Sequence, residues 1–278
     1  MFKIIADSCC DYKNEKGLFY DVKRIPLHIT IGNRTYIDNK DLDINNLLLD
    51  IDNSKTTPKS RCPSPDDYLG AIKGEADEIF IVTLSNKLSG SYNSALLAAN
   101  LYLEEHDDKK IHVFDTLSGT AGELVVVNQI QELINKNKSF TSIIEKVEYL
   151  IKNENKLYTV LENLDTLIKN GRLTKLQATL TSIAKIKLIL STTDGEIELH
   201  SKALSSAQAR SKVLKEIINS GKDFSEKTMF ITHCDALDIA NDFKRKVLLK
   251  TNFKNVEIFE ASGLSCVYAN RGGIIIAY

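Results

Sequence analysis

The chain of 278 residues carries 36 Lys and Arg against 37 Asp and Glu, which leaves a formal net charge of −1. Nucleic-acid-binding proteins usually show a basic excess or a basic stripe, so this balance argues against that class. Hydrophobic residues make up 43% of the chain and charged residues 26%, a mixture typical of a folded globular protein and not of a disordered one. The length predicts two domains or one large domain.

The cysteines and the start of the chain bear on the compartment. Five cysteines are present, and none belongs to a Cys-x-x-Cys pair, so the pattern fits neither a disulfide framework nor a zinc ribbon. The chain opens on a strand-like run without the features of a signal peptide, and no apolar stretch has the length of a membrane span. We therefore expect a cytoplasmic protein with reduced thiols and no transmembrane segment.

The first half of the chain alternates between strand and helix patterns. Runs rich in β-branched and aromatic residues predict strands at 2–7, 25–31, 78–84 and 111–115. Apolar residues at helical spacing predict helices over 89–105, 121–136 and 140–153. Alternation of this kind is typical of βαβ units, so we expect a parallel sheet with helices on both faces.

The second half has a different pattern. Strands are predicted at 186–191, 196–201, 228–233, 256–261 and 273–277, with helices over 205–219 and 236–250. Asp194-Gly195 joins the first two strands and is a strong hairpin signal. The change of pattern predicts an α/β domain over residues 1–155 and an α+β domain over residues 156–278.

Three loops that follow predicted strands collect small hydroxyl residues, at 58–65, 85–91 and 115–122. Ligands of open α/β sheets bind at the carboxyl ends of strands, and a helix N-terminus favours an anion. Ser89-Gly90-Ser91 is therefore a candidate anion site. Alternatively, Ser89 is simply the N-cap of its helix, which the spacing alone favours.

Catalytic and cofactor motifs are missing from the sequence. It contains no phosphate-binding Gly-x-x-x-x-Gly-Lys-Ser/Thr loop, no Gly-x-Gly-x-x-Gly and no Gly-x-Ser-x-Gly elbow. The five histidines are too scattered for a metal site formed by neighbouring residues. We therefore predict no catalytic residue, no metal and no cofactor of its own.

Five segments, in this order, resemble the DegV family of bacterial fatty-acid-binding proteins. They are Asp7-Ser8, Pro58-Lys-Ser-Arg-Cys-Pro-Ser-Pro65, Leu84-Ser-Asn-Lys-Leu-Ser-Gly-Ser-Tyr-Asn-Ser-Ala95, Asp115-Thr-Leu-Ser-Gly-Thr-Ala-Gly122 and Leu161-Glu-Asn-Leu-Asp-Thr-Leu-Ile-Lys-Asn-Gly-Arg-Leu-Thr-Lys175. The resemblance implies a Rossmann-like three-layer α/β domain with a parallel sheet, plus a smaller α+β domain with a mixed sheet. It also implies that a long-chain fatty acid lies in a buried tunnel completed by the second domain.

The resemblance further implies roles for individual residues. Ser60 and Ser89 would hold the fatty acid carboxylate, together with the N–H groups around Gly90. The protein would be the lipid-binding subunit of a fatty acid kinase and not itself an enzyme. A separate kinase subunit, related to dihydroxyacetone kinases, would phosphorylate the carboxylate with ATP, and the acyl phosphate would enter phospholipid synthesis.

Several positions depart from the family pattern. Arg61 and Cys62 replace the usual Ser and Gln, and Arg61 either pairs with the carboxylate or is a solvated loop charge. Tyr268 stands where the family has His, and Asn270 where it has Gly. Tyrosine can still donate a hydrogen bond to the head group. Arg172 is kept, and it would serve the kinase interface, contacts between the domains or a plain ion pair.

Two alternatives remain open at this point. One is a divergent member that binds another carboxylate ligand or only a protein partner. The other is a serine-dependent acyl hydrolase with Ser60 or Ser89 as nucleophile, although no general base accompanies either serine in a known motif. The crowding of Pro58, Pro63 and Pro65 fits a loop held in one shape around Ser60, because proline fixes φ.

Overall fold

Three β-sheets organise the structure, a computed structural model that describes residues 1–12, 22–173 and 186–278. The strands of sheet A, in spatial order, are β2 (Val22–Ile25), β1 (Phe2–Asp7), β6 (Glu78–Thr83) and β7 (Lys110–Asp115). All of these neighbours pair in parallel. The parallel sheet predicted for the first half of the chain is therefore confirmed.

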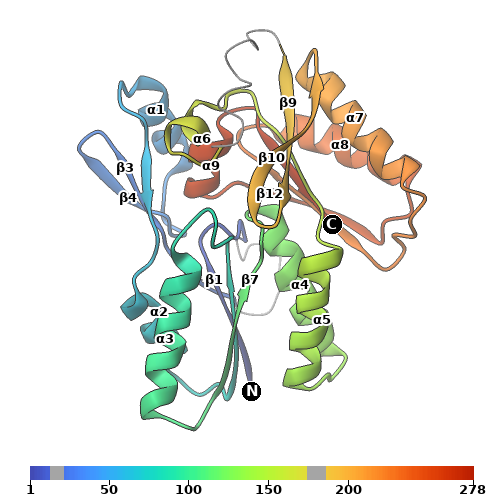
Figure 1. The fold of residues 1–278 in the computed structure, drawn as a ribbon. Helices are drawn as coiled ribbons and strands as arrows, with labels where there is room; N and C mark the ends of the chain where they lie inside the picture. The colour runs from blue at the N-terminus through green and yellow to red at the C-terminus, as the bar shows by residue number, and fades with distance from the viewer. Residues whose placement is uncertain (13–21, 174–185) are drawn as a thin grey trace.

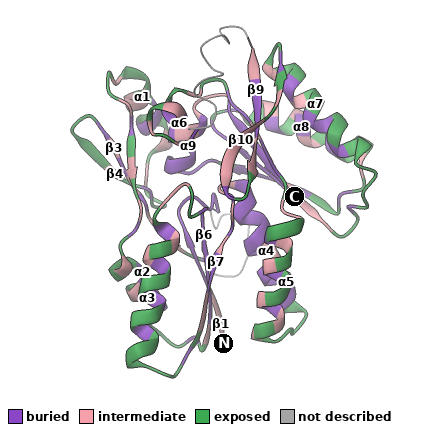
Figure 2. Cartoon of the chain, in the orientation of Figure 1, coloured by how far each residue is buried: buried purple, intermediate pink, exposed green. Residues whose placement is uncertain are grey.

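Helices cover both faces of sheet A, as the alternating pattern predicts (Figure 1). On one face lie α2 (Pro65–Ile72) and α3 (Ser91–Glu105), and on the other lie α4 (Ala121–Asn135) and α5 (Phe140–Asn153). The strands are buried, whereas the outer sides of α3 and α5 are exposed (Figure 2). This pattern is the one expected for a sheet enclosed between two helical layers.

Sheet C contains the strands of the second half. Their order is β10 (Glu196–Ala203), β9 (Lys187–Thr193), β8 (Leu157–Val160), β13 (Ile274–Ala277), β11 (Thr228–His233) and β12 (Asn255–Glu260). Only β11 and β12 pair in parallel among these neighbours, so the sheet is mixed as expected. The helices α7 (Ser206–Asn219) and α8 (Leu237–Lys250) pack on one of its faces. Asp194 and Gly195 form the β9–β10 turn with φ of 48° and 83°, which suits a two-residue hairpin.

All strands of sheet A precede residue 155 and all strands of sheet C follow it, but one hydrophobic core continues across this boundary. One hydrophobic cluster includes Phe80 of β6, Leu124 and Val127 of α4, and Phe230 of β11. The helix α4 therefore contributes to the cores beneath both sheets. The division into domains of 1–155 and 156–278 stays a prediction.

A small antiparallel sheet differs from the sequence-based expectation. Sheet B contains β4 (Arg34–Ile37), β3 (His28–Ile31) and β5 (Lys59–Arg61). The single strand expected over 25–31 is two strands in two sheets, because Pro26 has no N–H to donate and interrupts the ladder. The helices α1 (Ile44–Asn53) and α9 (Gly263–Ala269) contribute to the core beside sheet B. A short α6 (Asp165–Lys169) lies near α9.

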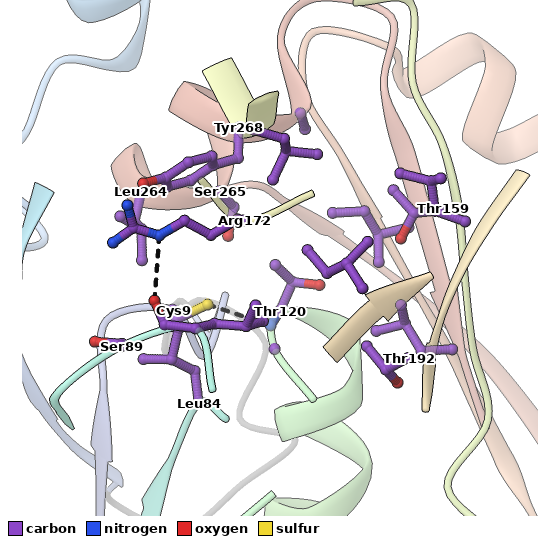
Figure 3. Close-up of a pocket in the computed structure, with 18 of the residues that line it drawn as sticks. Cys9, Leu84, Ser89, Thr120, Thr159, Arg172, Thr192, Leu264, Ser265 and Tyr268 are labelled. Atoms are coloured by element: carbon purple, nitrogen blue, oxygen red, sulfur yellow. Dashed lines mark hydrogen bonds between the residues drawn. The ribbon is translucent and has the colours of Figure 1, made fainter. Parts of the chain in front are cut away.

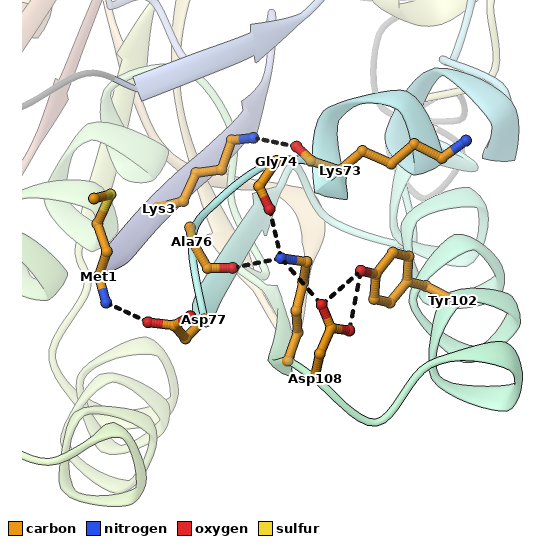
Figure 4. A network of polar contacts seen from close by, with 9 residues as sticks. Met1, Lys3, Lys73, Gly74, Ala76, Asp77, Tyr102 and Asp108 are labelled. Atoms are coloured by element: carbon orange, nitrogen blue, oxygen red, sulfur yellow. Dashed lines mark hydrogen bonds and ion pairs between the residues drawn. The ribbon is translucent and has the colours of Figure 1, made fainter.

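The amino ends of the sheet A strands are joined by a polar network (Figure 4). The ammonium group of Lys109, which is 9% exposed, donates to the carbonyl oxygens of Gly74 at 2.7 Å and Ala76 at 2.8 Å. The N-terminal ammonium group of Met1 pairs with Asp77 at 2.7 Å. These contacts lie at the end of the sheet opposite the three hydroxyl-rich loops.

Among the helices of the described ranges, none combines the length and hydropathy that a membrane crossing requires.

Candidate functional site

A cavity lies between the carboxyl ends of the sheet A strands and one face of sheet C (Figure 3). Its wall surrounds about 810 Å3 of space that no atom fills, and part of this space is open to solvent. Apolar side chains dominate its wall, namely Leu27, Leu84, Leu88, Leu157, Leu161, Leu167, Leu190, Ile197, Leu264, Ala269 and Ile275. The polar lining residues include Ser60, Ser89, Thr120, Thr159, Arg172, Thr192, Ser265 and Tyr268.

Ser60 and Tyr268 meet at one end of this cavity. The Ser60 hydroxyl lies 3.1 Å from the Tyr268 hydroxyl, and either can donate the hydrogen bond. Ser60 belongs to β5, where side chains alternate between the two faces, so its neighbours Lys59 and Arg61 are exposed. Arg61 is not among the lining residues described for the cavity, and its placement is that of a solvated charge.

Ser89 reaches the cavity from the loop before α3. The helix begins at Ser91, and its N-cap is Gly90, which makes no side-chain capping bond. Ser89 is therefore not the N-cap, yet its hydroxyl accepts the N–H of Ser91 at 3.2 Å. A Cβ on Gly90 would lie 3.1 Å from the sulfur of Cys62, so this glycine allows the Ser89 loop to approach the proline-rich loop. Gly90 itself is exposed and is not among the lining residues.

Arg172 is the one charged residue among the described residues that line the cavity. Its Nε donates to the carbonyl oxygen of Leu88 at 3.3 Å, and its Nη1 donates to that of Asn170. Figure 3 places it beside Tyr268 and on the side of the cavity where Ser89 lies. Through Leu88, Arg172 therefore links the second half of the chain to the first half, which is one of the roles considered for it. Thr174 and Lys175, at the end of the same segment, fall outside the described residues.

The buried carboxylate of Asp38 fixes α9, the helix that carries Tyr268. Asp38 is 2% exposed and accepts the N–H groups of Gly263 at 2.8 Å and Leu264 at 2.9 Å. Its Oδ2 also accepts the hydroxyl of Ser8 at 2.8 Å. The Asp-Ser motif at the end of β1 thus contributes its serine to the anchoring of α9. Anionic side chains are favourable at a helix N-terminus, where N–H groups lack partners within the helix.

Asp7, the other half of that motif, joins two strand ends. Its oxygens accept the N–H of Cys9 at 3.0 Å and the N–H of Leu84 at 3.0 Å. Burial raises the pKa of Asp7 to about 6, because these and other hydrogen bonds only partly compensate for the loss of water. Asp7 therefore holds the loop after β6, which leads to Ser89, against the end of β1.

The tip of the β9–β10 hairpin closes against the same loop. The Ser85 hydroxyl donates to the carbonyl oxygen of Gly195 at 2.7 Å. Gly195 has a φ of 83°, and a Cβ there would lie 2.5 Å from the Ser85 Oγ. Both the backbone conformation and the close approach therefore require glycine. This contact brings the end of β9 and the start of β10 to the cavity.

One side-chain cluster has the spacing of a metal site. Asp7, Cys9 and Glu123 each place a ligand atom within 4.8 Å of the others, and all three are buried. Burial raises the pKa of the Cys9 thiol and of the Glu123 carboxyl well above their usual ranges, so both groups favour their protonated forms. Asp7 already accepts two backbone N–H groups. A cation would therefore have to displace protons from Cys9 and Glu123 before these groups could serve as ligands.

Several lining residues were not identified as site residues from the sequence. Thr120 belongs to the hydroxyl-rich 115–122 loop, and its φ of 53° is unusual for a β-branched residue. Thr159 lies in β8, a four-residue strand too short for a periodic signal. Thr192 gave no signal either, because its contact with the cavity depends on how sheet C faces sheet A.

The arrangement suits an amphiphilic ligand. The hydroxyls of Ser60, Ser89 and Tyr268 lie on the same side of the cavity as the Arg172 guanidinium group, and together they can satisfy a polar or anionic head. The apolar remainder of the wall can bury a hydrocarbon chain. Asn270, where the family pattern has glycine, ends α9 with a φ of 55°, a conformation that glycine adopts at lower cost.

Comparisons with known proteins agree with this geometry. A family model described as an uncharacterised protein of the DegV family matches residues 1–278. A DegV domain-containing protein from Streptococcus gordonii is 36% identical over 282 positions, which cover 100% of this chain and 98% of that protein. A DegV family structure from Ruminococcus gnavus, described with vaccenic acid, is 36% identical with a TM-score of 0.94, covering 100% of this chain and 99% of that one. The Streptococcus pneumoniae Fatty Acid Kinase (Fak) B3 protein, loaded with linoleic acid, is 33% identical with a TM-score of 0.89 at the same coverage.

Proposed function

Because the chain belongs to the DegV family, we propose that it binds a long-chain fatty acid in the cavity and presents the carboxylate to a separate ATP-dependent kinase. The observation that carries the proposal is the division of the cavity wall. Ser60, Ser89 and Tyr268 supply hydroxyls at one end, and leucine and isoleucine side chains line most of the rest.

The energetics of burial support a hydrocarbon ligand. Each methylene removed from water contributes about 0.8 kcal/mol, so a chain of 16 to 18 carbons gains on the order of 10 kcal/mol before ordering costs. A carboxylate is ionised at neutral pH and needs hydrogen-bond donors when it leaves water. The hydroxyl pair of Ser60 and Tyr268 and the hydroxyl of Ser89 would supply them.

The relatives support the partner assignment. The pneumococcal relative is described as a fatty acid kinase protein loaded with linoleic acid, and the Ruminococcus relative is described with vaccenic acid. We infer that the present chain likewise acts with a dihydroxyacetone-kinase-like subunit and supplies acyl phosphate for phospholipid synthesis. A cytoplasmic location fits this role and the five free thiols.

The hydrolase alternative lacks the arrangement that it needs. A serine nucleophile requires a general base within hydrogen-bond reach. In the described part of the chain, the hydroxyl of Ser60 meets that of Tyr268 and the hydroxyl of Ser89 meets that of Ser91, and neither partner is a histidine, lysine or carboxylate, the usual bases for a serine nucleophile. The carrier function is therefore the better fit to the site.

Two measurements test the proposal. Mass spectrometry of organic extracts of the purified protein should find long-chain fatty acid at close to one molecule per chain. Delipidated protein reloaded with octadecanoic acid should then yield acyl phosphate when the kinase subunit and ATP are added. A protein that neither carries nor takes up any fatty acid would overturn the binding role, and loading without phosphorylation would overturn only the kinase role.

A further inference from the structure

Two threonines lie in an apolar part of the cavity wall, far from the carboxylate-binding end. Thr159 of β8 and Thr192 of β9 both line the cavity. Figure 3 shows them on the side opposite Ser89 and Tyr268. The lining residues next to them in sheet C are apolar, with Leu190 paired to Thr159 and Ile197 paired to Thr192. We call Thr159 and Thr192 the tail-end pair.

The hydroxyls of the tail-end pair have no protein partner among the described residues. No side-chain hydrogen bond within the described ranges joins the hydroxyl of Thr159 or of Thr192 to another group. A valine has nearly the same shape as threonine and would line an apolar wall without a hydroxyl to desolvate. An unpaired hydroxyl is unfavourable in a site that a hydrocarbon chain fills, because it loses its hydrogen bonds to water. The chemistry of the pair therefore fits a ligand that has its own polar group at this depth.

Strand geometry brings the two hydroxyls to one place. Antiparallel pairing of β8 and β9 sets Thr159 opposite Leu190. Thr192 follows Leu190 by two residues, so its side chain points to the same face of the sheet. The tail-end pair is thus a diagonal cross-strand pair, for which Cα atoms lie about 7–8 Å apart and side chains are closer. One ligand oxygen between the two hydroxyls can reach both, since each hydrogen bond spans about 2.8 Å.

We propose that the tail-end pair is a binding subsite for an oxygen atom on the acyl chain. The ligands that it selects are long-chain fatty acids with a hydroxyl or keto group far from the carboxylate. A threonine hydroxyl both donates and accepts, so the pair can satisfy either group. The inference rests on the proposed function, because the carboxylate must bind at Ser60 and Ser89 for the chain to reach Thr159 and Thr192.

The competing explanation is that these threonines are present for their β-propensity alone. In that case the wall behaves as an apolar one, and a hydroxyl on the chain weakens binding because it is desolvated without a partner. If the pair is a subsite, a hydroxyl on the carbon that lies beside Thr159 and Thr192 strengthens binding instead. The two explanations therefore predict opposite signs for the same comparison of affinities.

A displacement assay on delipidated protein separates them. A fluorescent fatty acid is displaced with octadecanoic acid and with a series of octadecanoic acids that carry one hydroxyl between carbons 2 and 16. We expect at least one isomer, with its hydroxyl in the distal half of the chain, to bind as tightly as octadecanoic acid or tighter. The Thr159→Val, Thr192→Val double variant should bind that isomer about tenfold more weakly and octadecanoic acid within threefold of the original protein.

Thr193→Val is the matched control, because Thr193 is exposed and neighbours Thr192 on the same strand. It should change neither affinity. The inference is overturned if every hydroxylated isomer binds more weakly than octadecanoic acid, or if the double variant keeps the affinity for the best isomer. Binding of octadecanoic acid in the same assay tests the proposed function separately, so its absence would overturn both.

Discussion

The hydroxyl oxygens of Ser60 and Tyr268 lie 3.1 Å apart, although 208 positions separate the two residues in the sequence. Ser60 is held by the pairing of β5 with β3, and Tyr268 is held on α9 by the carboxylate of Asp38. Two independent anchors therefore set one polar contact at the end of the cavity. One hydroxyl can donate to the other while that other donates to a carboxylate at this position, which makes the pair a unit in binding.

The first prediction concerns this pair. Ser60→Ala and Tyr268→Phe should each weaken binding of octadecanoic acid about tenfold or more, because each removes one member of a hydrogen-bonded chain that ends on a charged group. The double variant should lose less than the product of the two factors, since the remaining hydroxyl in each single variant has already lost its partner. Fluorescence displacement titrations of the original protein, the two single variants and the double variant give the coupling free energy between Ser60 and Tyr268 in binding.

Tyr149→Phe serves as the control for this cycle, because Tyr149 lies on α5 and is 60% exposed. Its affinity should match that of the original protein. Strict additivity of the two losses would show that Ser60 and Tyr268 act on the ligand independently, contrary to the structure.

The second prediction concerns the anchor of α9. Asp38→Ala removes the acceptor of the Ser8 hydroxyl and of two backbone N–H groups, those of Gly263 and Leu264. Leaving these buried donors unpaired should lower the free energy of unfolding by about 3 kcal/mol, as measured by urea denaturation. The exposed Asp41→Ala variant should stay within about 0.5 kcal/mol. A similar loss in both variants would contradict the anchoring role.

Local signals in the sequence identified elements whose cause is local. The β9–β10 hairpin follows from Asp194 and Gly195, because the turn itself requires positive φ at both positions. The parallel sheet A followed from buried strands that alternate with amphipathic helices. The alternating pattern of residues 25–31 predicts a single strand, but the chain changes sheets at Pro26, an effect that periodicity alone does not reveal.

The cavity itself was only partly predictable. Ser60 and Ser89 were found through their loops and the family resemblance, and both line the cavity. Its closure depends on the pairing of Ser85 with Gly195 and on the placement of Tyr268 beside Ser60, contacts between residues more than 100 positions apart. No periodicity within a short window encodes such contacts. The wall residues Thr159 and Thr192 could be assigned only after the orientation of sheet C was known.

The third prediction concerns the length of the acyl chain. Ile197 lines the cavity on β10 and pairs with Thr192 at the end far from Ser89. Ile197→Phe should fill this end and weaken binding of octadecanoic acid about tenfold, because the chain no longer fits without rearrangement of the wall. Dodecanoic acid, which stops short of this end, should keep its affinity.

Ile197→Val is the matched control, because it makes the same position slightly smaller. Displacement titrations with acids of 12, 14, 16 and 18 carbons should give the same rank order for this variant and for the original protein. Equal weakening of all four acids by Ile197→Phe would show that the substitution acts on the fold or on the carboxylate end instead of the tail.

The fourth prediction concerns pH and Asp7. The pKa of this buried carboxyl is about 6, against an ordinary value of 3.8, because burial disfavours the charged form. The folded protein therefore holds this proton more tightly than the unfolded chain does. The stabilising contribution is complete below pH 3.8 and is lost as the pH rises through 6. Between pH 4.5 and 7.5 it should fall by about 2 kcal/mol.

Comparison with Asp7→Asn isolates this contribution from the other titrating groups. The asparagine keeps the shape and cannot ionise, but its amide nitrogen cannot accept the N–H of Cys9 or Leu84, so one hydrogen bond is lost at every pH. The stability advantage of the original protein over this variant, measured by urea denaturation, should be about 2 kcal/mol larger at pH 4.5 than at pH 7.5. For the exposed Asp107→Asn, the difference should stay nearly constant. An advantage that grows with rising pH would mean that the hydrogen bonds from Cys9 and Leu84 outweigh burial and that Asp7 is ionised across this range.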